Sequence, residues 1–230
     1  MFVGHTAVAL VAKSRMPAVS LGWWMAAAFA LDLLWPFLLL AGIERVSIVR
    51  GATAFNPLVF DSYPWSHSLT MACVWGILLA AFARARGVRR AGAALLAAVV
   101  VSHWVLDFAS HTPDMPLWPG DSPRLGLGLW NSVAATLLIE GVMFIAAVVL
   151  YVRATRAVDR IGVIAFWSFI LISTGAWASS PWSAPPRECQ SPRVVRAYEV
   201  VTGRVDGLGR SPSTRKMIAI AALHKQRRFS

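Results

Sequence analysis

The chain has 230 residues, of which 57% are hydrophobic and only 14% are charged. About a quarter of the residues in an average soluble domain are charged, so this composition argues against a soluble protein and predicts a multi-pass membrane protein. The net charge of +11 does not indicate a nucleic-acid partner, because the basic residues concentrate towards the C-terminus and no base-reading element is visible. We expect membrane lipids as partners instead, and the sequence indicates no protein partner.

The apolar segments predict an all-α membrane bundle of about five spans. In chain order, these lie at residues 21–42, 66–83, 91–108, 130–152 and 161–178. Residues 2–12 are also apolar, but crossing a bilayer takes about 20 residues, so we expect a half-depth helix there. Pro36 is expected to kink the first span. The stretches 44–65 and 109–129 carry turn signals and are predicted to be loops.

A change of composition after Trp182 divides the chain. We expect residues 1–182 to form one membrane-embedded domain. The remaining residues, 183–230, are rich in Ser, Pro and Arg and are predicted to be a basic tail, either disordered or produced by a shifted reading frame. We assign this tail no function.

Basic residues predict the orientation of the bundle. They cluster at Lys13 and Arg15, at residues 84–90 and at residues 153–160, and these clusters alternate with the loops at 44–65 and 109–129. The positive-inside rule places such clusters in the cytoplasm. We therefore expect a multi-pass protein of a bacterial-type inner (plasma) membrane, with both loops on the outer side.

Polar side chains recur every fourth residue at the end of the third span. His103, Asp107 and His111 would lie along one face of a helix, and ionisable groups inside a membrane are costly enough to indicate a functional site. Counting residues at ~1.5 Å each places further polar groups at a similar depth in the outer half of the membrane. The predicted metal ligands are His5, Asp32, His67, His103, Asp107 and His111, and the predicted catalytic carboxylates are Asp107 and Glu140.

The donor types narrow the choice of metal. The two cysteines, Cys73 and Cys189, form no Cys-x-x-Cys pattern, so an ion would be held by His and carboxylates, which favours zinc, manganese or iron. The alternative is that each polar side chain forms a structural hydrogen bond to a neighbouring helix or loop.

Several short motifs occur in a characteristic order. They are Gly4-His5, an aspartate in the first span, Ser66-His67-Ser68-Leu69, Ser102-His103-x-x-x-Asp107 and Pro116-Leu-Trp-Pro119. In this order the sequence resembles the bacterial membrane-bound metal-dependent hydrolases described as YdjM-like or as LexA-binding inner-membrane hydrolases, which are thought to be distantly similar to zinc-dependent phospholipase C. The resemblance covers roughly residues 2–120.

The resemblance implies a divalent metal, with zinc as the expected ion, and hydrolysis of an ester or phosphoester. Two departures concern the metal: Leu34 stands where the family has a second aspartate, and residues 61–66 replace its histidine-arginine pair. A site that holds two ions in the family is therefore expected to hold one here, unless His111 and Asp114 compensate.

Three functions remain open from the sequence. The first is a membrane-embedded hydrolase acting at the outer half of the membrane on a lipid or lipid-linked substrate, with a metal-activated water and a carboxylate as base. The second is a proton- or ion-coupled transporter, which the apolar inner halves of the spans do not favour. The third is a non-catalytic membrane scaffold with a structural metal site.

Overall fold

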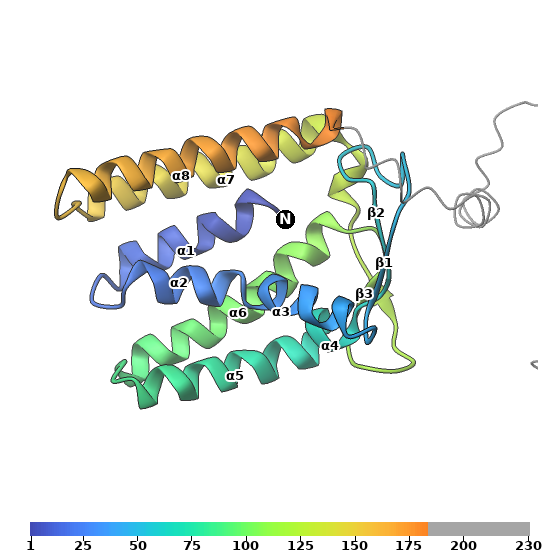
Figure 1. The fold of residues 1–230 in the computed structure, drawn as a ribbon, viewed down its shortest axis with the longest axis horizontal. Helices are drawn as coiled ribbons and strands as arrows, with labels where there is room; N and C mark the ends of the chain where they lie inside the picture. Colours follow the sequence, from blue (N-terminus) through green and yellow to red (C-terminus); the bar gives the residue numbers. More distant parts are fainter. Residues whose placement is uncertain (184–230) are drawn as a thin grey trace, which may run out of the picture. The chain divides into compact units, whose positions relative to one another are not determined.

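The computed structural model describes residues 1–183, all within one compact unit. The predicted tail lies, from residue 184 on, outside the described residues. Helices dominate, as the sequence predicts, and Figure 1 shows them running side by side. They are α1 (Val3–Arg15), α2 (Leu21–Ala28), α3 (Ala30–Leu40), α4 (Pro64–His67), α5 (Leu69–Ala85), α6 (Arg90–Ser110), α7 (Val133–Ala154) and α8 (Arg160–Ser179).

Three helices are long and apolar enough to cross a membrane. They are α6, α7 and the helix formed by α8 with the 3-10 turn that follows it, over Arg160–Trp182. Helices α2 and α3 together would make a fourth span, whereas α5, at 17 residues, falls short of this length. The all-α fold class is thus confirmed, three helices have the length and apolarity expected of a membrane protein, and the count of about five spans stays a prediction. On α7 and α8 large apolar side chains such as Leu138 and Leu171 are exposed, which suits a surface in contact with lipid.

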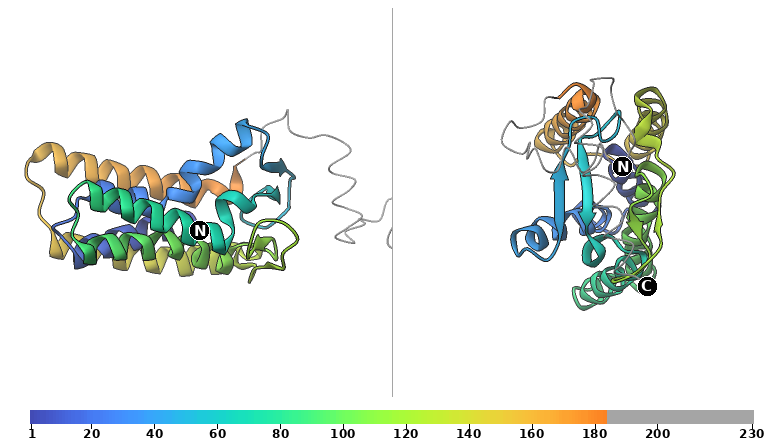
Figure 2. Two further views of the ribbon diagram at one scale, coloured as in Figure 1. Left: turned by 90° about the horizontal axis from the view of Figure 1, so that it is seen from below. Right: turned by 90° about the vertical axis from the view of Figure 1, so that its right-hand side faces the viewer.

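The first predicted span is interrupted at Phe29 and not at Pro36. Helices α2 and α3 meet there at an angle of 52°, and Figure 2 shows α3 leaving the direction of the other helices. Pro36 lies inside α3 without ending it. A kink at Pro36 stays a prediction, and the break at Phe29 was not predicted. At this break the Ala28 carbonyl oxygen lies 2.7 Å from His103 Nδ1, a tertiary contact that the local sequence does not show.

The two predicted loops each contain a short antiparallel hairpin. Strands β1 (Arg45–Ile48) and β2 (Leu58–Ser62) pair in the first, with Arg45 opposite Ser62. Strands β3 (Met115–Pro116) and β4 (Arg124–Leu125) pair in the second. Because β2 ends directly before Tyr63 and Pro64, where α4 starts, the first hairpin fixes the beginning of the helix that carries His67.

Figure 1 shows the turns α1–α2, α5–α6 and α7–α8 at one end of the helices and both hairpins at the other. Helix α1, predicted to be a half-depth helix, packs against α2, α6 and α7, and its Leu10 is fully buried together with Leu96 of α6 and Trp24 of α2. The core thus surrounds α1, which carries His5 into the interior of the bundle.

Candidate metal centre

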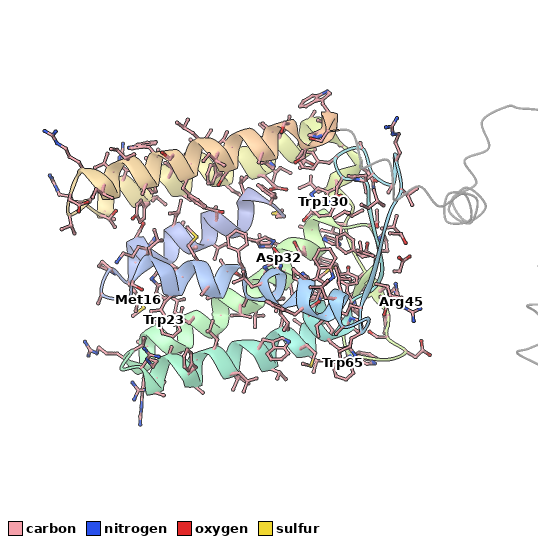
Figure 3. All side chains as sticks on the ribbon, viewed as in Figure 1. Met16, Trp23, Asp32, Arg45, Trp65 and Trp130 are labelled. Atoms are coloured by element: carbon pink, nitrogen blue, oxygen red, sulfur yellow. The ribbon has the colours of Figure 1, made fainter. Side chains whose placement is uncertain are left out.

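Five of the predicted metal ligands come together inside the bundle. Two groups of side chains could each hold a metal ion, with the ligand atoms of each group within 4.8 Å of one another. The first group is His5, His103 and Asp107, and the second is Asp32, His67 and His103. Figure 3 labels Asp32 in the interior between the helices. These residues come from α1, α3, α4 and α6 and are up to 102 positions apart in the chain.

The distances between the ligand atoms fit a small divalent ion. Asp107 Oδ1 lies 3.0 Å from His5 Nε2, and Asp107 Oδ2 lies 3.1 Å from His103 Nε2. Asp32 Oδ1 lies 3.3 Å from His67 Nε2 and 3.6 Å from His103 Nε2. Ligands of a tetrahedral zinc ion, each about 2.1 Å from the metal, are about 3.4 Å apart. The arrangement therefore needs little change to coordinate such an ion.

His103 is oriented by the break between α2 and α3. Its Nδ1 lies 2.7 Å from the carbonyl oxygen of Ala28, an atom that in an uninterrupted helix would accept from the N–H of Asp32. The ring therefore donates through Nδ1 and leaves the Nε2 lone pair facing Asp32 and Asp107. Because α6 is a regular helix, Asp107 follows one turn after His103 on the same face.

His67 is oriented through Ser66, which belongs to the predicted Ser66-His67-Ser68-Leu69 motif, and through Glu44, which was not predicted as a site residue. The Ser66 hydroxyl donates to Glu44 Oε2 at 2.6 Å and lies 2.7 Å from His67 Nδ1. Because the hydroxyl proton goes to Glu44, the serine oxygen accepts from His67 Nδ1–H, and Nε2 keeps its lone pair. Glu44 Oε1 also accepts from the backbone N–H groups of Trp65 and Ser66, at 2.8 Å each.

Two histidine nitrogens of the cluster lack a hydrogen-bond partner within the described part of the chain. His5 Nδ1 and His103 Nε2 are buried without a hydrogen-bond partner among the described residues, an arrangement that costs free energy unless another ligand is present. The rings of His5 and His103 stack 3.7 Å apart and nearly parallel. The amino group of Met1 already places a positive charge here, against Asp107 Oδ1 and 3.2 Å from His5 Nε2. A cation therefore suits this position.

The two carboxylates differ in exposure. The side chain of Asp107 is 4% exposed, whereas that of Asp32 is 42% exposed. Both oxygens of Asp107 face histidines of the cluster. Asp32 is therefore the more accessible of the two carboxylates.

His111, predicted as a sixth ligand, lies outside both groups. Helix α6 ends at Ser110, and His111 adopts an extended backbone that takes it off the face shared by His103 and Asp107. Its Nδ1 lies 3.0 Å from Asp114 Oδ1, which also accepts from the Tyr63 hydroxyl at 2.6 Å. Burial and the neighbouring Asp114 raise the pKa of Tyr63 well above its ordinary value, so its hydroxyl stays a donor.

Glu140, predicted as a catalytic carboxylate, has a different set of partners. Its Oε2 accepts from the backbone N–H groups of Phe2 and Val3, at 2.9 and 3.2 Å. Helix α1 has no side-chain cap of its own at this end, so Glu140 satisfies donors that the helix start leaves unpaired. This contact fixes α1, and with it His5, against α7. Glu140 belongs to neither metal-binding group, and a catalytic role for it stays a prediction.

A cavity of about 440 Å³ reaches the cluster, a volume typical of small-molecule sites. His5, Asp32, His67 and Asp107 form part of its wall, and His111 lines it as well. Most of the remaining wall is aromatic or aliphatic: Phe2, Trp35, Phe55, Leu58, Phe60 and Trp130. A bound molecule would meet polar ligand atoms on one side and apolar side chains on the other.

The fold and the cluster together describe a helical protein that has three helices long and apolar enough to cross a membrane and a His–Asp cluster that could hold a metal ion. No family model, no curated protein and no solved structure matches the chain.

Proposed function

We propose that the protein is a membrane-embedded hydrolase that uses one divalent ion, zinc or an ion of similar chemistry, to cleave an ester or phosphoester bond. The observation that carries this proposal is the meeting of three histidines and two aspartates in one cluster, of which two histidines and both aspartates line a cavity. The order of motifs that resembles the YdjM-like hydrolases supports it as well. The chemistry that such an ion supplies is activation of water at neutral pH and polarisation of the bond to be cleaved.

The donor set supports a single ion. Neutral imidazoles and carboxylates are the ligands of catalytic zinc sites, and two aspartates match the charge of a divalent cation. His103 belongs to both groups, and one imidazole nitrogen has one lone pair for one ion. The two groups therefore cannot both be filled at once, and one ion is what these residues support.

The exposure of the carboxylates suggests their roles. We assign Asp107 to metal binding together with the three histidines, because its oxygens lie within 4.0 Å of Nε2 of His5, His67 and His103. Asp32 reaches the cavity and is the better candidate to accept the proton of an attacking water. His111 is held through Nδ1 by Asp114, so its Nε2 is the nitrogen available to hydrogen-bond a substrate or to protonate a leaving group.

The substrate class follows from the cavity wall. Aromatic and aliphatic side chains suit an acyl or prenyl chain, and the site lies among helices of membrane-spanning length. We therefore propose a lipid or lipid-linked ester or phosphoester. The positive-inside pattern supports an inner-membrane protein whose site faces the outer side.

A structural role for the ion is the second candidate. The cluster joins α1, α3, α4 and α6, so an ion there would also tie four helices together. In this case the protein would be a scaffold without hydrolytic activity.

The test combines metal content with hydrolysis. The purified full chain would be analysed by elemental analysis and assayed against phospholipids and nitrophenyl esters and phosphodiesters, beside His103→Ala and His111→Gln. We expect wild type to carry about one equivalent of zinc and to hydrolyse a substrate, His103→Ala to lose both, and His111→Gln to keep the metal with a lower kcat. Negligible metal in wild type would overturn the proposal, and retained metal without hydrolysis would favour the scaffold.

A further inference from the structure

A second cavity lies at the other end of the helices from the hairpins, between the turns α1–α2 and α5–α6. It has a volume of about 750 Å³, and Figure 3 labels two of its lining residues, Met16 and Trp23, far from Asp32. Four arginines line it: Arg15, Arg86, Arg89 and Arg90. We call this cavity the arginine groove.

Both turns that form the arginine groove are held in place. Lys13 Nζ donates to the carbonyl oxygens of Pro17 and Val19, at 2.5 and 3.0 Å, and Arg84 Nη1 donates to that of Val88 at 2.6 Å. A Cβ atom on Gly92 would lie 3.0 Å from side-chain atoms of both Val19 and Val88. The turns are therefore packed closely against the start of α6, and the groove has a defined shape.

The charge in the groove has no counterpart among the described residues. The ion pairs of the described part of the chain involve only histidines and the Met1 amino group, and no acidic side chain lines the groove. Helix α6 also starts here, and no side chain at its N-cap position, Arg89, accepts from its first N–H groups. The positive end of the helix dipole adds to the four guanidinium groups.

One arginine of the groove is positioned by aromatic rings. The Arg86 guanidinium carbon lies 5.7 Å from the centre of the Phe82 ring, and Phe82 packs edge-on against Trp23 at 5.7 Å. Guanidinium groups bind phosphate oxygens in pairs of parallel hydrogen bonds. A tryptophan beside them is typical of the interface between lipid headgroups and chains.

We propose that the arginine groove binds the phosphate of an anionic lipid headgroup. The lipid is favoured over a soluble phosphate compound because the groove lies where α6, a helix of membrane-spanning length, begins, and because Trp23, Met16 and Pro17 give it an apolar side. This site is separate from the metal centre and does not depend on hydrolysis.

The test measures lipid binding to the purified full chain in detergent, with dioleoyl phosphatidylglycerol and dioleoyl phosphatidylcholine as probes and native mass spectrometry as the readout. We expect phosphatidylglycerol to bind at least about tenfold more tightly, and the triple variant Arg86→Gln, Arg89→Gln, Arg90→Gln to lose this preference. The matched control removes three arginines from the α7–α8 turn at the same end, Arg153→Gln, Arg156→Gln and Arg160→Gln, and should keep it.

Three outcomes would overturn the proposal. Equal binding of the two lipids would show that the groove does not recognise an anionic headgroup. Equal losses in both triple variants would assign the preference to overall charge. Displacement of phosphatidylglycerol by millimolar glycerol phosphate would identify a site for a soluble phosphate compound instead of a lipid.

A charge-preserving variant, Arg89→Lys with Arg90→Lys, should weaken binding because lysine lacks the paired donors of arginine.

Discussion

The three histidines of the metal centre differ in what holds their second ring nitrogen. His103 Nδ1 contacts the Ala28 carbonyl oxygen, and His67 Nδ1 contacts Ser66, which is bound in turn to Glu44. His5 Nδ1 has no partner among the described residues and relies on ring stacking with His103. Since such outer contacts fix the tautomer that binds a metal, His67 and His103 are the better prepared ligands.

At this scale we predict that Ser66→Ala weakens zinc binding by roughly 10–100-fold, because His67 would lose the acceptor that fixes its tautomer. The measurement is a zinc titration of the purified protein against a competing chelator.

The matched control for this prediction is Ser68→Ala. Ser68 caps α5 by accepting from the N–H of Met71 and makes no described hydrogen bond to His67, so its loss should lower stability by about 1 kcal/mol and leave zinc affinity unchanged. Equal zinc affinity for Ser66→Ala and wild type would contradict the role given to Ser66.

The sequence predicts some residues of the site and not others for a physical reason. His103 and Asp107 are one helical turn apart, a relation that spacing alone reveals. Glu44 reaches Ser66 across 22 positions only because β1 and β2 fold back on each other, and nothing in its local sequence indicates this. His111 continues the four-residue spacing, but α6 ends one residue earlier, so His111 does not lie on the helix face that the spacing predicted.

At the level of the helices, α5 and α6 approach each other closely at Gly76. A Cβ atom there would lie 3.0 Å from the carbonyl oxygen of Ala97 and 3.4 Å from its Cα. Because the neighbour is backbone, relief would require the two helices to separate. Small residues commonly allow such contacts between membrane helices.

We predict that Gly76→Val lowers stability by roughly 1–3 kcal/mol, since overpacking forces backbone shifts. The readout is the Tm of the full chain in detergent. Gly175→Val in α8 is the matched control, because a Cβ atom at that glycine has no atom within 4 Å. A Tm for Gly76→Val as high as that of Gly175→Val would contradict the close packing of α5 and α6.

The elements themselves could be predicted in part. Apolar length located α6, α7 and α8 to within a few residues, because a run of about 20 apolar residues has few alternatives to a helix. It could not locate the break at Phe29, since this depends on the Ala28 carbonyl contacting a histidine 75 positions away. The hairpins escaped prediction because their strands are no longer than five residues.

For the whole molecule, the candidate metal centre brings together side chains of α1, α3, α4 and α6. We predict that removing the ion with a chelator destabilises the protein. At a free zinc concentration 100 times Kd the loss would be roughly 3 kcal/mol, which corresponds to a fall in Tm of several degrees. The measurement is thermal unfolding with and without chelator.

His103→Ala provides the comparison for this prediction. It lacks the residue common to both metal-binding groups, so its Tm should not respond to chelator, and adding zinc to the chelated wild type should restore the original Tm. A wild-type Tm that is the same with and without chelator would count against an ion at this position.

The interruption at Phe29 also has a thermodynamic consequence. At this interruption the Ala28 carbonyl oxygen is free to contact His103 Nδ1. The change of direction between α2 and α3 also sets the position of Asp32, which lies in α3. Binding of an ion to the candidate metal centre and the bend between α2 and α3 are therefore thermodynamically coupled. Because such coupling is reciprocal, a change that straightens the bend between α2 and α3 should lower the affinity for an ion. A bound ion should in turn disfavour the straight form by the same free energy.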